Sequence, residues 1–324
     1  MNGCHRLVVA IAALCAVCMA APAAGADAYP ARAVRIIVGF PPGASGDLAA
    51  RAVGGRLSQV LGQQFVIENR PGASSSIAAE SAARAPKDGY TLFLGTVANV
   101  VNVAITPNLP FDFSKDFVPI GLAAIVPVML VVHPSIGVNS MPELIELAKS
   151  KPGALFYASS GVATTPHLAG ALLNARAGIN LVHVPYQGAP PAVTDLLAGR
   201  TQVMFSSAAT VMPHVTAGKL KALAWAASKR SSIAPDLPTV AELGMPDLDA
   251  SIWFGLMAPA GTPADIVDKL AHELNEALKS PELLNSLRSQ GYEPLGGTSQ
   301  DFSRYIESEL RKWTAAAQVA GIRM

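Results

Sequence analysis

Two loops in the sequence contain residue types that favour chemistry with a small anion. Residues 40–47 read FPPGASGD and residues 159–165 read SSGVATT. Each loop follows a short apolar run and precedes an amphipathic pattern, so we expect each to end at a helix N-terminus, where unpaired backbone N–H groups bind anions. Glycines at 43, 46 and 161 allow the backbone to approach a ligand closely. The alternative stays open that both are ordinary strand–helix turns, because such turns also occur where nothing binds.

Enzyme chemistry finds little support in the same residues. Ser160 and His167 lie near each other, but the G-x-S-x-G pattern is absent and no acidic residue stands out as an orienting partner. Neither loop matches a phosphate loop or a dinucleotide fingerprint. The other histidines after residue 26 are scattered without metal-ligand spacing: His133, His183, His214 and His272. We therefore expect no catalytic residue, no metal and no cofactor; a secreted hydrolase would require Ser160 as its nucleophile.

The N-terminus predicts secretion. Arg6 precedes an apolar run over 7–21, and the small residues at 23–26 offer a cleavage site before Asp27. A run of about fifteen apolar residues is shorter than the roughly 20 that span a bilayer, and no later segment reaches that length. The three cysteines, at 4, 15 and 18, all lie in this segment. We predict a signal peptide over 1–26 and a periplasmic mature protein without disulfides.

Composition narrows the choice of partners. The net charge is +1 and charged residues make up 15% of the chain. A basic face for nucleic acid and a polybasic segment for a membrane surface are both missing from the sequence. We expect a small-molecule partner, no nucleic acid and a monomer.

Short apolar runs alternate with amphipathic helical patterns along the mature chain, which is typical of a mainly parallel α/β architecture. The predicted strands lie at 34–38, 64–68, 90–94, 154–158, 181–184, 202–205 and 221–226. The predicted helices follow residue 46 and lie near 75–83, 141–149, 192–198 and 208–217, with one opening at Pro166 and two or three at the C-terminus. A capping box at Ser140 and Glu143 starts one of them, and Thr262 with Pro263 and Asp265 predicts the start of another. Asp47 and Arg51 stand four residues apart on one predicted helix, where a structural ion pair is as good an interpretation as a role near a ligand.

The apolar stretch 118–132, broken by two prolines, predicts a passage from one lobe to another, and 251–259 predicts the return. The second lobe is thus expected to be an insertion in the first. Lobe 1 would comprise 27–125 and 254–324, and lobe 2 would comprise 126–253.

Ordered motifs over essentially the whole mature chain carry a resemblance to a known family. They are YP at 29–30, FPPG at 40–43 with Asp47, ENRPGA at 68–73, DGYTL at 88–92, YASSG at 157–161 with TPH at 165–167, HVPY at 183–186, DLPTVAE at 236–242, and WFGL at 253–256 with APAGTP at 258–263. The sequence resembles the Bug receptors, the solute-binding components of tripartite tricarboxylate transporters.

The resemblance implies a two-lobe fold of the type II periplasmic-binding class that closes on a carboxylate without chemical change. It implies these ligand-binding candidates: Pro41, Gly43, Ala44, Ser45, Asp47, Thr96, Asn99, Ser160, Gly161, Thr164, Thr165, His167, Ser206 and Ser207. The implied partners are a small organic carboxylate and the transporter's membrane subunits. An alternative from another class is a ligand-sensing periplasmic component of a membrane signalling system.

The sequence departs from the family pattern in three places. Ala44 stands where a second glycine is usual, and Ala73-Ser74-Ser75-Ser76 replaces a more glycine-rich run. Ser206 and Ser207 replace the common acid or amide that faces the distal end of the ligand. Two hydroxyls suit a neutral or carboxylate end better than an amino group, which favours a dicarboxylate or an aromatic carboxylate.

Overall fold

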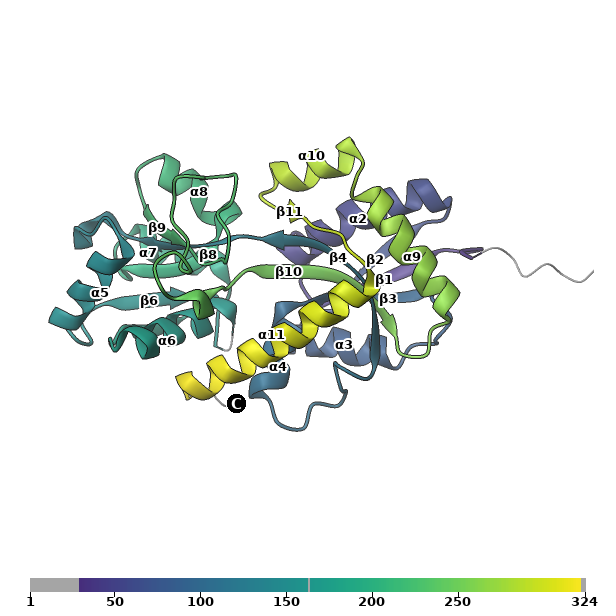
Figure 1. Ribbon diagram of the computed structural model, residues 1–324, viewed down its shortest axis with the longest axis horizontal. Coiled ribbons are helices and arrows are strands. Elements are labelled where there is room, and N and C mark those ends of the chain that lie inside the picture. The colour runs from purple at the N-terminus through teal and green to yellow at the C-terminus, as the bar shows by residue number, and fades with distance from the viewer. Residues whose placement is uncertain (1–28, 163, 322–324) are drawn as a thin grey trace, which may run out of the picture.

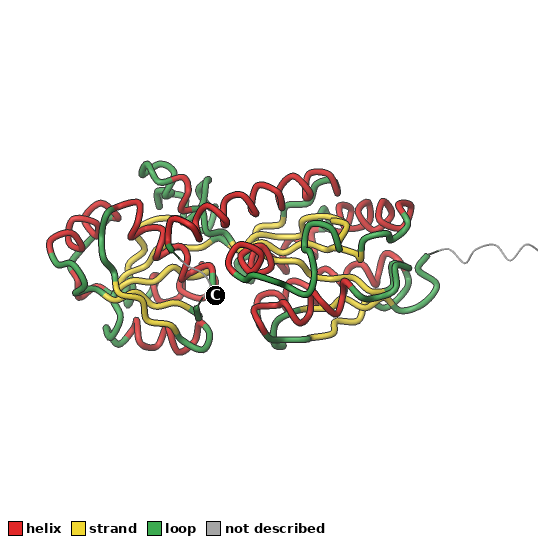
Figure 2. The backbone as a smooth tube through the Cα atoms, turned by 90° about the horizontal axis from the view of Figure 1, so that it is seen from below, coloured by secondary structure: helices red, strands yellow, loops and turns green. Residues whose placement is uncertain are grey.

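The chain builds two β-sheets, one in each of two lobes that are joined by crossing strands (Figure 1). The structure, a computed structural model, describes residues 29–321 except residue 163, so the predicted signal peptide lies outside the described residues. The first sheet has six strands in the order β11-β4-β10-β3-β1-β2, and the second has five in the order β7-β6-β8-β5-β9. Helices flank the strands of both lobes (Figure 2). The predicted two-lobe α/β fold is confirmed.

Apolar, β-branched runs form the strands. The first sheet contains β1 (Val34–Val38), β2 (Phe65–Asn69), β3 (Thr91–Thr96), β4 (Phe117–Val126), β10 (Ile252–Pro259) and β11 (Glu293–Pro294). The second contains β5 (Val128–Val132), β6 (Phe156–Ser159), β7 (Val182–Pro185), β8 (Val203–Ser207) and β9 (Lys221–Trp225). All residues of β3 and β5 are buried, as expected for strands covered on both faces. The predicted strands lie within two residues of these bounds.

The expectation of mainly parallel sheets is wrong. In the first sheet β1 pairs in parallel with β2 and β3, but β10 is antiparallel to β3 and β4, and β11 is antiparallel to β4. In the second sheet β6 is parallel to β7 and β8, whereas β5 is antiparallel to β8 and β9. The cause is the inserted lobe, since a strand that leaves a sheet for the other lobe is matched by one that returns in the opposite direction.

The crossing passes through Pro127, which separates β4 of the first sheet from β5 of the second. The return strand β10 pairs with β4 up to the register Ile252↔Val126. The chain therefore passes from the first sheet to the second, and back again, at the two places where the sequence predicts passages. The lobe boundaries at 126 and 254 remain a prediction.

Helices connect the strands of each lobe. Their bounds are α2 (Ser45–Leu61), α3 (Ser76–Ala83), α4 (Val97–Ile105), α5 (Met141–Ser150), α6 (Thr165–Ala177), α7 (Ala189–Leu197), α8 (Ala208–Thr216), α9 (Ala264–Ala277), α10 (Pro281–Ser289) and α11 (Ser299–Ala320). Ser140 caps α5 as predicted, because its hydroxyl accepts the Glu143 N–H. Thr262 does not cap α9: its hydroxyl donates to the Pro259 carbonyl at 2.8 Å instead. Among the described residues, no helix is long and apolar enough to cross a membrane.

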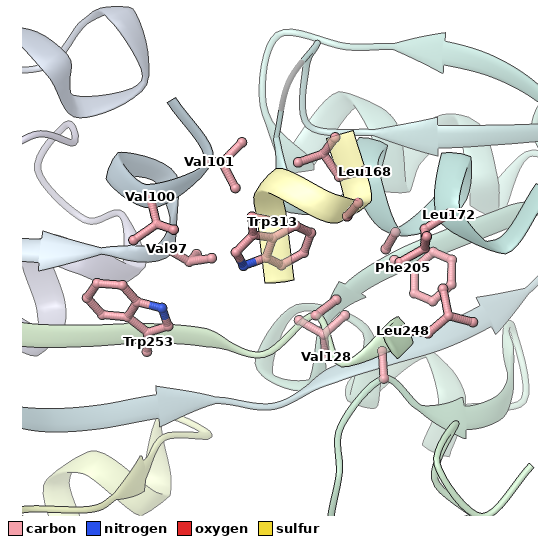
Figure 3. Close-up of a cluster of buried hydrophobic side chains, with 14 of the residues drawn as sticks. Val97, Val100, Val101, Val128, Leu168, Leu172, Phe205, Leu248, Trp253 and Trp313 are labelled. Carbon is pink, nitrogen blue, oxygen red and sulfur yellow. The ribbon is translucent and has the colours of Figure 1, made fainter. Parts of the chain in front are cut away.

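One apolar cluster is shared by the two lobes. It joins residues of β10, α4 and α11 to residues of α6 and β8. Trp313 of α11 lies between the valines of α4 and Leu168 of α6 (Figure 3). Two further clusters fill the other face of each sheet. Helix α11 therefore packs against both lobes rather than against the first alone.

A buried carboxylate anchors α11 to the crossing strand. Glu309 is 4% exposed, and its Oε2 accepts hydrogen bonds from the indole N–H groups of Trp253 on β10, at 3.0 Å, and Trp313, at 3.1 Å. Lys312 forms an ion pair with the other carboxylate oxygen. The two indoles are themselves almost fully buried, so this carboxylate satisfies donors that water cannot reach.

Candidate functional site

Strand pairing brings the predicted ligand loops of both lobes to one interface. In the first sheet β1 and β3 run in the same direction as β4, whose carboxyl end at Val126 leads into the second lobe. In the second sheet β6 runs parallel to β8, whose carboxyl end at Ser207 pairs with Val128, the first residue after the crossing. The carboxyl edges of the two sheets therefore face each other. Ligands of open α/β sheets bind at such edges.

Every predicted site residue lies at a strand end, in a loop or at a helix start at these facing edges. Pro41, Gly43, Ala44, Ser45 and Asp47 follow β1 or begin α2, and Thr96 and Asn99 end β3 and begin α4. From the other lobe, Ser160, Gly161, Thr164, Thr165 and His167 connect β6 to α6, and Ser206 and Ser207 end β8. Their role in binding remains a prediction.

Asp47 organises the first loop from within. It is 1% exposed, and its Oδ2 accepts the Gly43 N–H at 2.8 Å and Arg51 Nε at 2.9 Å. Its Oδ1 accepts Asn69 Nδ2 and Arg51 Nη2, each at 2.9 Å. Burial raises the pKa of Asp47, but the hydrogen bonds from Arg51, Gly43 and Asn69 outweigh that effect and leave it below 3.8. With four donors engaged, this carboxylate holds the loop in shape.

Helix α2 presents an uncapped N-terminus at the same edge. Its N-cap residue is Ala44, which has no side-chain acceptor, and the first helical hydrogen bond is Leu48 N–H to the Ala44 carbonyl. Within the described residues, the N–H groups of Ser45, Gly46 and Asp47 have no acceptor. The Tyr292 hydroxyl holds the start of the helix by donating to the Ser45 carbonyl at 2.7 Å. This end of the helix lacks the anionic or polar acceptor that helix N-termini favour.

The facing loop of the second lobe is hydrogen-bonded to itself. Ser159 Oγ lies 2.9 Å from the Gly161 carbonyl oxygen, and Thr164 Oγ1 donates to the same oxygen at 2.7 Å. The Tyr186 N–H donates to Ser159 and the Gly188 N–H to Ser160, which ties the turn after β7 to this loop. Gly161 has a φ of +142°, a conformation open to glycine and rarely to other residues.

Two polar pairs complete the edges. Asn99 Oδ1 accepts the Thr96 N–H at 3.1 Å, and both residues are buried. On the second lobe, Ser206 is buried, whereas Ser207 Oγ lies 2.7 Å from Thr210 Oγ1 in the first turn of α8.

His183 belongs to this edge, although its position in the sequence did not indicate it. The rings of His167 and His183 stack with centroids 3.9 Å apart, and the rings of Tyr157 and His183 stack with centroids 4.8 Å apart. His183 Nε2 lies 2.7 Å from Ser159 Oγ. Burial, with a smaller contribution from His167, lowers the pKa of His183 to about 4, and burial lowers that of His167. Both rings are therefore neutral near pH 7.

The pairing of His183 with Ser159 does not make a triad. In the described residues the hydrogen-bond partner of the His183 ring is the Ser159 hydroxyl, and no group of three or more histidine, cysteine, aspartate or glutamate side chains is placed to hold a metal. The groups that the candidate site offers to a ligand are backbone N–H groups, hydroxyls and one amide.

A cavity of about 620 Å³ also lies between the lobes, along α8 and the turn after α10. Its walls are mostly apolar, with Met212 and Ile233 on one side and Arg288 on the other. None of the predicted site residues lines it. Across the gap, a Cβ added to Gly291 would lie 2.9 Å from the Cβ of Ala209. The two lobes therefore touch on this side of the site.

Two lobes joined by crossing strands, with helix N-termini on the facing sheet edges, define the class of periplasmic solute-binding proteins. The chain belongs to the tripartite tricarboxylate transporter family receptors, whose family model matches residues 49–322. The predicted family is confirmed, and members of this family are substrate-binding receptors rather than enzymes.

Known relatives agree over nearly the whole chain. Protein BugT of Bordetella pertussis is 35% identical over 321 residues, which cover 98% of each chain. The solved structure of R. palustris Rpa4515 with adipate is 37% identical, with a TM-score of 0.80 over 91% of this chain and 99% of that one. MatC from Rhodopseudomonas palustris with bound malate is 30% identical, with a TM-score of 0.76 over 89% of this chain and 99% of that one.

Proposed function

We propose that this protein is a periplasmic receptor that captures a small organic carboxylate, preferably a dicarboxylate, and delivers it to the membrane subunits of a tripartite tricarboxylate transporter. A cleaved signal peptide over 1–26 would place it in the periplasm. The observation that carries the proposal is the uncapped N-terminus of α2, whose free N–H groups lie at the edge that faces the second lobe.

The available interactions are strong enough for capture. A helix N-terminus contributes up to about 2 kcal/mol to a partly buried anion, and each hydrogen bond to a charged acceptor contributes roughly 1.5–3 kcal/mol. Two or three such bonds with shape-matched burial reach the ~8 kcal/mol of a micromolar complex. Adipate and malate, bound by two relatives, are both dicarboxylates, which fits the hydroxyls at 206 and 207.

Closure of the lobes completes the proposed mechanism. The carboxylate docks on the first lobe, the second lobe rotates about the crossing strands, and the 160–165 loop covers the ligand. A ligand drives this change only through contacts that are better in the closed form. Small-angle scattering with a bound dicarboxylate should show a more compact particle than without it.

The first experiment is a thermal-shift screen of residues 27–324 against mono-, di- and tricarboxylates, aromatic acids, amino acids and neutral amides. A ligand of the folded state raises the Tm by mass action. A response only to uncharged compounds would show that the carboxylate proposal is wrong.

Two variants at one position test the helix N-terminus itself. Ser45→Pro removes one free N–H at the first helical residue, where proline is well tolerated, and the extended backbone of Ala44 suits a following proline. Ser45→Ala removes only the hydroxyl. We expect calorimetry to show an affinity loss of roughly tenfold or more for Ser45→Pro beyond any loss in Ser45→Ala. Equal affinities would mean that the N–H does not bind the ligand.

A further inference from the structure

We propose that Ser75 and Asn99 form a polar floor to the cleft, where the Ser75 hydroxyl and the Asn99 amide donate to the two oxygens of one carboxylate group. This inference rests on the proposed function and adds two side-chain donors to it. Ser75 is not among the residues that the family resemblance implies, and its hydroxyl belongs to the serine run at 74–76.

Both donors lack partners in the part of the chain that the structure describes. Ser75 and Asn99 are each 0% exposed, and neither Ser75 Oγ nor Asn99 Nδ2 has a hydrogen-bond partner. The orientation of the Asn99 amide is set by its Oδ1, which accepts the Thr96 N–H, so the nitrogen faces the other way. A buried polar group without a partner costs about 1–3 kcal/mol, so two of them at one sheet edge call for an acceptor.

The two donors lie at the same carboxyl edge. The Ser75 hydroxyl lies directly against Gly39, the residue that follows β1, because a Cβ built there would be 2.0 Å from Ser75 Oγ. Asn99 is in the first turn of α4, which follows β3, and β1 and β3 are neighbouring parallel strands.

A second asparagine shows that this face of α4 meets the serine loop. Asn102, one turn after Asn99, donates from Nδ2 to the Ser74 carbonyl at 2.8 Å and lies 2.9 Å from Ser76 Oγ. Residues three apart on a helix share a face, so Asn99 is directed to the same side. In this arrangement α6 of the second lobe packs against α4. For a ligand to reach the floor, separation of the lobes must uncover it.

The backbone at this loop makes a matched control possible. Ser74 and Ser75 both have left-handed backbones, with φ of +48° and +75°, which glycine adopts without strain. Ser74 is exposed, whereas Ser75 is buried. Ser74→Gly and Ser75→Gly therefore relieve the same kind of strain, but only the second removes the buried hydroxyl. Ser75→Ala removes the hydroxyl and keeps the strain.

Calorimetry with adipate and malate, together with melting curves, tests the proposal. We expect Ser75→Gly and Ser75→Ala to lose roughly 10- to 100-fold in affinity for the dicarboxylate that the wild type binds, while Ser74→Gly retains wild-type affinity. Both glycine variants should melt no lower than the wild type. Unchanged affinity in Ser75→Gly, an equal loss in Ser74→Gly, or a lower Tm in Ser75→Gly alone would each overturn the proposal.

The outcome also separates this proposal from the function on which it rests. If the wild type binds no carboxylate in the screen, the proposed function fails and the floor fails with it. If the wild type binds and Ser45→Pro weakens binding, but the Ser75 variants do not, the receptor function stands and the floor alone is wrong.

Discussion

Asp47→Asn tests whether Asp47 shapes the 40–47 loop or contacts the ligand itself. The substitution keeps the size of the side chain and removes its charge. Asp47 accepts four hydrogen bonds, and an amide can accept those on one oxygen only. If the amide oxygen faces Gly43 and Arg51 Nε, its NH₂ group faces the donors of Asn69 and Arg51 Nη2. Two bonds are then lost.

The loss in stability follows from those two bonds. At roughly 1.5 kcal/mol each, taken at the low end because the Arg51 side chain is 51% exposed, the cost is about 3 kcal/mol. For a chain of this size that corresponds to a fall in Tm of roughly 6 °C. The pKa of Asp47 lies below its unfolded value, so its charge stabilises the fold above that value and this contribution is lost as the pH falls through the folded pKa. The difference between wild type and variant should therefore shrink below pH 3.8.

The assay is thermal melting combined with calorimetry across the carboxylate panel. Asp247→Asn is the control, because Asp247 forms an exposed ion pair with Arg176 whose loss should cost less than about 1 kcal/mol. If Asp47 positions the loop, the variant weakens every carboxylate by a similar factor and keeps their order of affinity. A reversed order of ligands, or an unchanged Tm, would refute this reasoning.

Three other perturbations have defined outcomes. Glu309→Ala leaves two buried indole N–H groups without an acceptor and should lower the free energy of unfolding by about 4 kcal/mol. Glu309→Gln should lower it by less than half of that amount. Urea unfolding followed by tryptophan fluorescence measures both, and equal losses would contradict the buried-acceptor argument. The Tm should fall as the pH drops from 6.5 towards 4, because His167 and His183 take up protons in the unfolded chain that they do not take up in the fold. His183→Gln should make the Tm less dependent on pH over this range. The pair Ala209→Cys with Gly291→Cys should form a disulfide under oxidation once the lobes part slightly, because the 2.9 Å between the two Cβ positions is shorter than the roughly 3.5–4.5 Å of a disulfide. The bond should slow ligand release at least tenfold in stopped-flow experiments, with reduction restoring the rate; an unchanged rate would mean that these residues separate little during release.

Local patterns in the sequence predict much of the fold because burial of apolar side chains and the backbone preferences of proline and glycine act over a few neighbouring residues. The run VRIIV forms β1 where its apolar residues are buried, and the proline and glycines after it form the turn that precedes α2. The passage at Pro127 is visible in the sequence because a long apolar stretch is interrupted there by proline. The antiparallel pairing of β10 could not be derived in this way, since pairing direction depends on where the inserted lobe returns the chain.

The candidate site could be predicted where it consists of loops, but not where it depends on contacts between segments that are distant in the sequence. The loops at 40–47 and 159–165 could be recognised in the sequence by their glycines and hydroxyl side chains. His183 stacks on His167 and contacts Ser159 from 24 residues away along the chain, and no spacing rule signals that contact. The left-handed backbone at Ser75 is equally hidden, because serine seldom adopts it and a run of three serines suggests only a polar loop.

The state of the polar groups on the two edges implies an order of events. On the first lobe, the first three N–H groups of α2, the Ser75 hydroxyl and the Asn99 amide nitrogen have no partners in the described residues. On the second lobe, the hydroxyls of Ser159 and Thr164 already donate to a carbonyl of their own loop. An anion therefore gains most by docking on the first lobe, and the second lobe adds its contacts on closing. The effect of the disulfide between residues 209 and 291 should consequently depend on when it is formed. If it is formed before the ligand is added, it should block binding. If it is formed afterwards, it should prevent release.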